Sequence, residues 1–101
     1  MIRILFIFYF IQLNFNGISQ NEKRYIKIYK EGNSFFNIGE FEKAIDLYKK
    51  SIKLNPNFCD ASFKLGICYK NLENYLLYKN TFKNLREKGC FIYSDRINYE
   101  L

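Results

Sequence analysis

The chain has 101 residues, of which 49% are hydrophobic and 20% aromatic, so it can fold around one small core and is not a disordered chain. One proline and five glycines are too few for an all-β chain with many turns, which favours helices. The formal net charge is +6 and histidine is absent, which removes the commonest general base and metal ligand and argues against most hydrolases and metalloenzymes.

Residues 1–19 are predicted to be a cleavable signal peptide. Arg3 is followed by an apolar run from Ile4 to Ile11, and the small residues of Gly17-Ile18-Ser19 place the expected cleavage before Gln20. The apolar run is shorter than the roughly 20 residues that cross a bilayer, so we expect no membrane span after cleavage. We therefore expect an exported protein, periplasmic or secreted. The other interpretation is an N-terminal helix or strand of the core.

An internal repeat with a period of about 34 residues organises the rest of the chain. The identities at this offset pair Lys30 with Lys64, Gly32 with Gly66, Asn37 with Asn71, and Lys49 with Lys83. Within the first unit, apolar residues recur at helical spacing on both sides of Gly39-Glu40, which is the predicted turn. The second helix is expected to stop near Asn55-Pro56, because the residue before a proline is pushed out of helical geometry. The second hairpin is expected to turn near Asn74.

Residues 25–58, and less closely 59–92, resemble tetratricopeptide repeats, a family with a period of about 34 residues. The first unit matches the family signature at Gly32, Phe35, Ala44, Tyr48 and Pro56, while Ile28 and Glu31 replace the usual Trp and Leu. The resemblance implies an all-α fold for residues 20–101, with antiparallel helical hairpins stacked as a short superhelix. Gly32 and Ala44 are expected where the first two helices cross, because both lack bulk.

The second unit departs from the family pattern at two positions. Tyr78 stands where the first unit has Ala44, and Cys90 stands where it has Pro56. Because a tyrosine would overpack the crossing, we expect the second hairpin to be splayed or slid in register. Two hairpins are also fewer than such stacks need. Residues 93–101 are therefore expected to form a short capping helix; the alternative is that the chain dimerises.

The sequence has three cysteines, so at least one of them has no disulfide partner within the chain in an oxidising compartment. Cys59 and Cys68 lie about 13 Å apart along one predicted helix and cannot bridge. Cys59 and Cys90 could bridge, since the start and the end of a helical hairpin lie at the same end. The sequence favours the other interpretation, in which these cysteines are small buried hydrophobic residues, and leaves both open.

The resemblance implies a protein-binding module, because tetratricopeptide proteins hold partners on the concave face lined by the first helix of each repeat. The residues that the alignment places on this face are Tyr29, Asn33, Phe36, Asn37, Phe63, Ile67, Lys70 and Asn71. Tyr29 and Phe63 stand where a carboxylate-binding lysine would help. A hydrophobic or amphipathic partner segment is therefore expected rather than a C-terminal carboxylate. The other interpretation is that Tyr29, Phe63 and Ile67 only pack together.

The sequence thus predicts an exported adaptor that binds a protein or peptide and is not an enzyme. The alternative is a structural, self-associating subunit of an envelope complex. No phosphate loop, metal-ligand set or catalytic triad is visible in the sequence, so no cofactor or metal is expected. The lysines are interleaved with acids along the chain, as on a solvated helix surface, so no nucleic-acid partner is expected.

Overall fold

The structure, a computed structural model, describes residues 23–90. All regular structure in this range is helical. A helix covers residues 23–37 and is followed by α2 (Phe41–Leu54), α3 (Cys59–Asn71) and α4 (Tyr75–Glu87). The predicted all-α fold is confirmed. The signal peptide predicted at 1–19 and the cap predicted at 93–101 lie outside the described residues.

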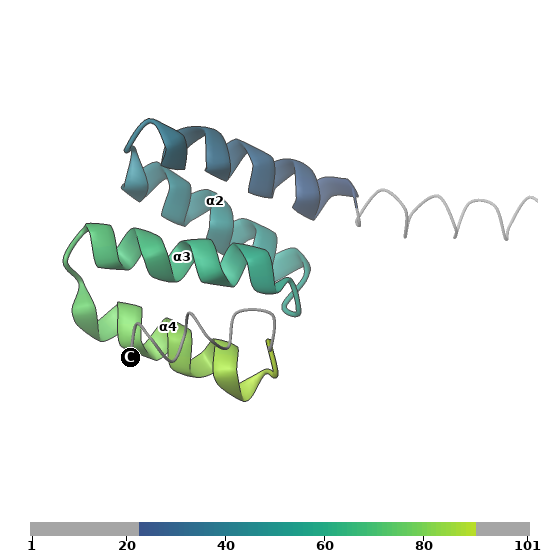
Figure 1. The fold of residues 1–101 in the computed structure, drawn as a ribbon. Helices are drawn as coiled ribbons and strands as arrows, with labels where there is room; N and C mark the ends of the chain where they lie inside the picture. Colours follow the sequence, from purple (N-terminus) through teal and green to yellow (C-terminus); the bar gives the residue numbers. More distant parts are fainter. Residues whose placement is uncertain (1–22, 91–101) are drawn as a thin grey trace, which may run out of the picture.

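The helices form two antiparallel hairpins that stack side by side (Figure 1). The turns that precede α2 and α4 lie at one end of the stack, and the loop between α2 and α3 lies at the other. Helix α3 packs against α2 on one side and against α4 on the other. The first helix of the second hairpin, α3, thus lies against the first hairpin, as the repeat resemblance implies.

Both hairpins turn through a residue in the left-handed backbone region. Gly39 has φ 81° and Glu73, at the equivalent position of the second repeat, has φ 62°. The backbone amide of the following residue donates a hydrogen bond of 2.9 Å to a carbonyl near the end of the preceding helix and so closes that helix. The bond runs from Glu40 to Phe35 in the first turn and from Asn74 to Tyr69 in the second. The predicted turn at Gly39-Glu40 is confirmed. Glycine adopts this conformation freely, whereas it costs Glu73 about 1–2 kcal/mol.

The other helix boundaries follow from local chemistry. Asn55, at the end of α2, is extended, with φ −138° and ψ 92°, as expected for a residue before proline. Its amide still donates to the Ser51 carbonyl at 3.0 Å, so the predicted stop near Asn55-Pro56 is confirmed. At the start of α4, the Asn74 side chain accepts a hydrogen bond from the Leu77 amide at 3.3 Å and caps the helix.

In each hairpin a glycine lies directly against an aromatic ring. A Cβ atom on Gly32 would lie 2.7 Å from Cε1 of Tyr48, and one on Gly66 would lie 2.5 Å from Cε2 of Phe82. Both distances are shorter than real Cβ contacts, so a side chain at either glycine would push the helices apart. The sequence placed Gly32 opposite Ala44. Ala44 is fully buried, but the close approach to Gly32 is made by the Tyr48 ring.

The expectation that Tyr78 splays the second hairpin or slides its register was wrong. The contact of Gly66 with Phe82 repeats the contact of Gly32 with Tyr48 at equivalent positions of the two repeats, so the register is kept. Tyr78 is only 4% exposed, and its ring packs at a steep angle against Phe82, with centroids 5.0 Å apart. The tyrosine is therefore part of the core and fills space beside the crossing.

Candidate partner-binding surface

The first helices of the two repeats, residues 23–37 and α3, meet near the turn end of the stack. The ammonium group of Lys64, on α3, lies over the ring of Phe36, 4.3 Å from its centroid. This contact is a cation–π interaction that joins the two helices. We call the eight residues of these two helices that are predicted to bind a partner the A-helix surface.

Tyr29 and Asn33 are two half-buried members of this surface that contact the second helix. The Tyr29 ring lies 4.9 Å from the Phe58 ring and 5.8 Å from the Tyr48 ring. The Tyr48 hydroxyl donates a hydrogen bond of 2.6 Å to Oδ1 of Asn33. Burial, then the nearby Cys68 and Tyr29, raise the pKa of Tyr48, so it keeps its proton and donates. Tyr29 and Asn33 thus have structural partners of their own.

Phe63 and Ile67 are half-buried and pack against the core. The Phe63 ring meets the Phe82 ring edge to face, with centroids 5.6 Å apart. The Ile67 carbonyl accepts a hydrogen bond of 2.9 Å from the side-chain amide of Asn71. The interpretation that these residues pack on the core is consistent with these contacts, although each keeps part of its side chain at the surface.

The exposed members of the A-helix surface are Asn37, Lys70 and Asn71. All three lie in the last two turns of their helices, close to the turn end of the stack. The ammonium group of Lys70 lies 5.8 Å from the centroid of the Tyr78 ring. The structure therefore divides the eight predicted residues. Asn37, Lys70 and Asn71 offer exposed amide and ammonium groups, and the other five residues are half-buried.

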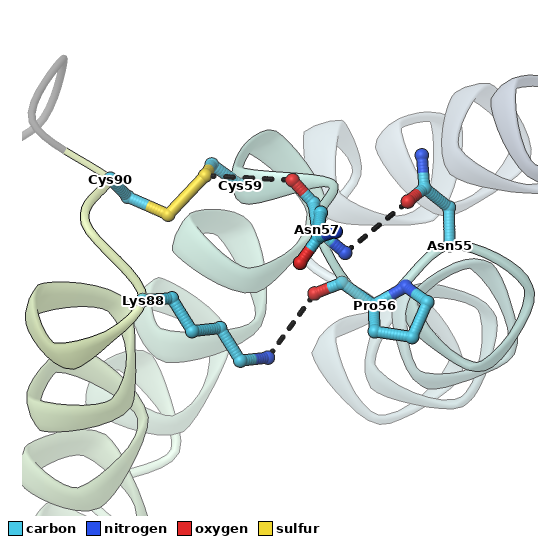
Figure 2. The surroundings of a disulfide bond; sticks show 6 residues. All are labelled: Asn55, Pro56, Asn57, Cys59, Lys88 and Cys90. Carbon is cyan, nitrogen blue, oxygen red and sulfur yellow. Dashed lines mark hydrogen bonds between the residues drawn. A yellow bond between two sulfur atoms is a disulfide. The ribbon is translucent and has the colours of Figure 1, made fainter.

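The opposite end of the stack is closed by a disulfide bond. Cys59, the first residue of α3, is bonded to Cys90, just after α4, with Cα atoms 6.0 Å apart (Figure 2). This separation lies within the range that a disulfide spans. Beside it, the ammonium group of Lys88 donates a hydrogen bond of 3.2 Å to the Pro56 carbonyl. The interpretation of Cys59 and Cys90 as unpaired buried residues was thus wrong, because the hairpin brings their Cα atoms together.

Three residues that matter here were not predicted from the sequence to take part in these contacts. Phe58 precedes α3 and packs its ring against Tyr25 and Tyr29, with centroids 5.0 and 4.9 Å away. Ser51 is fully buried and donates a hydrogen bond of 2.8 Å to the Tyr25 carbonyl. Lys64 covers Phe36. Of these three, only Ser51 had a signal in the sequence. It lies three residues after Tyr48 on α2 and therefore shares the face that Tyr48 turns toward the first helix.

Within residues 23–90, no group of three or more His, Cys, Asp or Glu side chains is placed to hold a metal ion. In the same range no helix combines the length and the apolar character needed to cross a membrane. Every buried side-chain nitrogen or oxygen atom in the described part has a hydrogen-bond partner.

Comparison with known proteins agrees with this geometry. A family model described as TPR repeat matches residues 32–72, and one described as Tetratricopeptide repeat matches residues 60–88. Photosystem I assembly protein Ycf3 of Acaryochloris marina is 44% identical over 46 residues, which are 46% of this chain and 27% of that protein. An uncharacterized protein of Methanocaldococcus jannaschii is 34% identical over 58 residues, which are 57% of this chain and 67% of that protein.

The match thus spans about a quarter of the length of the Acaryochloris marina protein and two thirds of the Methanocaldococcus jannaschii one. No solved structure matches the chain. The two family matches together run from residue 32 to residue 88, a range that holds both glycine–aromatic contacts and both left-handed turns. The chain therefore belongs to the tetratricopeptide repeat family.

Proposed function

We propose that the chain is an exported adaptor that binds a segment of a partner protein on the A-helix surface and carries out no catalysis. The observation that carries the proposal is the contact between Lys64 and Phe36, which sets the two first helices side by side. Asn37, Lys70 and Asn71 are exposed near the ends of these two helices, which also carry half-buried apolar side chains. Such a surface suits an extended or helical segment that offers both apolar groups and hydrogen-bond acceptors.

The partner is a protein segment of amphipathic character. Phe36 and Ile67 are half-buried and present apolar area, while the side-chain amide of Asn37 and the ammonium group of Lys70 are exposed at the same end. Lys70 favours acidic groups or backbone carbonyls on the partner, because an ammonium group donates and does not accept hydrogen bonds. The relative named as a photosystem I assembly protein supports a role in binding other proteins.

Export is the second part of the proposal. Disulfide bonds persist in oxidising compartments and are rare in the cytosol, so the bond between Cys59 and Cys90 supports export. Residues 1–19, with the pattern of a signal peptide, point the same way. Mass spectrometry of the protein from its native host tests this part: the expected N-terminus is Gln20, and an intact Met1 contradicts cleavage.

Matched pairs of substitutions test partner binding. Arginine at Asn37 and Asn71 puts two bulky charges on the A-helix surface, whereas arginine at Asn80 and Asn84 puts the same charges on exposed positions of α4. We expect Asn37→Arg/Asn71→Arg to weaken capture of the native partner about tenfold, as for the loss of about 1.4 kcal/mol at an interface. Asn80→Arg/Asn84→Arg should leave capture unchanged.

Circular dichroism checks that both double variants keep the helical content of the wild type. Equal capture by both variants would mean that the partner binds elsewhere on the chain. If capture fails only with the α4 variant, the binding surface lies on the second helices.

A further inference from the structure

The charges of the described residues are distributed unevenly along the stack. Residues 23–29, 48–65 and 81–90 make up the half that contains the disulfide (Figure 1), and they hold ten lysines and arginines against two acidic residues. Residues 30–47 and 66–80 make up the half that contains the two turns, and they hold four lysines against five acidic residues. The net positive charge of the described residues therefore lies entirely in the disulfide half.

Contacts between three chain segments gather these cations at one end of the stack. Ser51 donates a hydrogen bond of 2.8 Å to the Tyr25 carbonyl, which ties the end of α2 to the start of the first helix. In the loop that follows, the Phe58 ring packs on the Tyr25 ring, with centroids 5.0 Å apart. Lys88 donates a hydrogen bond of 3.2 Å to the Pro56 carbonyl, which ties the end of α4 to the same loop. The exposed cations on these segments, which we call the basic end, are Lys23, Arg24, Lys27, Lys50, Lys53 and Lys88.

The composition of the basic end favours lipid headgroups over a protein segment or a nucleic acid. Five of its six cations are lysines, whereas specific protein–protein interfaces are depleted in lysine and enriched in arginine. Single-stranded nucleic acids stack on open aromatic faces, but the Tyr25 ring at this end is packed against Phe58. An anionic bilayer presents many dispersed negative charges, which lysines attract without a fixed geometry.

Two aliphatic side chains at the same end add a second argument for a bilayer. Ile26 and Leu54 are 39% and 41% exposed. Ile26 directly precedes Lys27, and Leu54 directly follows Lys53. Exposed aliphatic groups beside lysines are the pattern of proteins that lie in a membrane interface, where ammonium groups contact headgroups and aliphatic groups enter the boundary with the acyl chains.

We propose that the basic end binds the surface of an anionic lipid bilayer and holds the protein there by its disulfide end. The exposed residues Asn37, Lys70 and Asn71 lie near the turns, at the opposite end of the stack. Membrane binding therefore leaves the proposed partner-binding residues accessible (Figure 1). The proposal does not depend on which protein segment the A-helix surface binds.

Cosedimentation of the purified protein with vesicles tests the proposal. We expect binding to vesicles of phosphatidylcholine and phosphatidylglycerol in equal amounts, and release in about 0.5 M sodium chloride, which screens exposed charges. Vesicles of phosphatidylcholine alone control for binding through the apolar residues 1–19, which does not depend on lipid charge. Lys23→Gln/Lys53→Gln should weaken binding about thirtyfold, because each cation near an anionic surface contributes about fivefold.

The matched control removes the same charge at the other end of the stack. Lys43→Gln/Lys79→Gln, at exposed positions near the turns, should change vesicle binding less than about twofold, because charges further away than a screening length of about 10 Å contribute little. Circular dichroism checks that both double variants keep the helical content of the wild type. Capture of the native partner, measured without vesicles, should be the same for Lys23→Gln/Lys53→Gln and the wild type.

Three results would overturn the proposal. Equal binding to vesicles with and without phosphatidylglycerol would mean that lipid charge is not recognised. Equal weakening by the two double variants would mean that net charge, and not the basic end, drives binding. Tighter binding of soluble polyglutamate than of the vesicles would mean that the basic end takes an acidic protein segment.

Discussion

Removing the disulfide tests how the second hairpin is held together. The substitutions are Cys59→Ala and Cys90→Ala in one chain. The bond joins residues 31 apart in sequence, and closing a loop of that length lowers the entropy of the unfolded chain enough to stabilise the fold by about 3.7 kcal/mol at 25 °C. A domain of this size has a total stability of about 4–11 kcal/mol. The bond is therefore a large fraction of the stability, and its loss should lower the melting temperature by about 15–30 °C.

Thermal unfolding followed by circular dichroism at 222 nm measures the effect on four samples: the wild type and the double variant, each with and without dithiothreitol. The reduced wild type should melt close to the double variant. The double variant should not respond to dithiothreitol, because its remaining Cys68 is an unpaired, buried thiol. A wild type that melts at the same temperature with and without reductant, or at the same temperature as the variant, would refute the reasoning.

Three further predictions concern single groups. Gly66→Ala should lower the free energy of unfolding in urea by about 1–3 kcal/mol, because its Cβ would lie 2.5 Å from Phe82; an unchanged midpoint would mean that the ring moves aside freely. Glu73→Gly should raise it by about 1 kcal/mol, since φ is 62° there; a loss of stability contradicts the strain argument. Burial raises the pKa of Cys68 to about 11 from 9.0. The stability that this thiol contributes is therefore complete below about pH 9 and is lost as the pH rises through 11. Melting temperatures between pH 8 and 11 should fall less steeply for Cys68→Ala than for the wild type, and parallel curves would exclude the effect.

Much of the fold could be predicted because its boundaries depend on local chemistry. The glycine at 39 and the proline at 56 fix a turn and a helix end through backbone geometry alone, and both predictions were confirmed. The turn at Glu73 has no glycine, so only the repeat period indicated it. The position of Tyr78 was predicted wrongly because spacing gives the face of a helix but not the rotamer. The Tyr78 side chain lies beside Phe82 and does not enter the space where α3 and α4 cross.

The exposure of the residues proposed to bind a partner was harder to predict than the fold. The alignment correctly placed the eight residues on the first helices, but it could not separate the exposed Asn37 and Lys70 from the half-buried Tyr29. That separation depends on Phe58, whose ring covers Tyr29 from the loop before α3. The disulfide depended on whether two Cα atoms come within about 7 Å, a distance that sequence spacing does not give.

The two repeats are held together by different kinds of link. In the first repeat, Ser51 bonds to the Tyr25 carbonyl and Phe58 packs on Tyr29, and both links are non-covalent. In the second repeat, the bond between Cys59 and Cys90 is covalent. A change in the redox potential of the surroundings therefore acts directly on the second hairpin, while the first hairpin keeps its contacts.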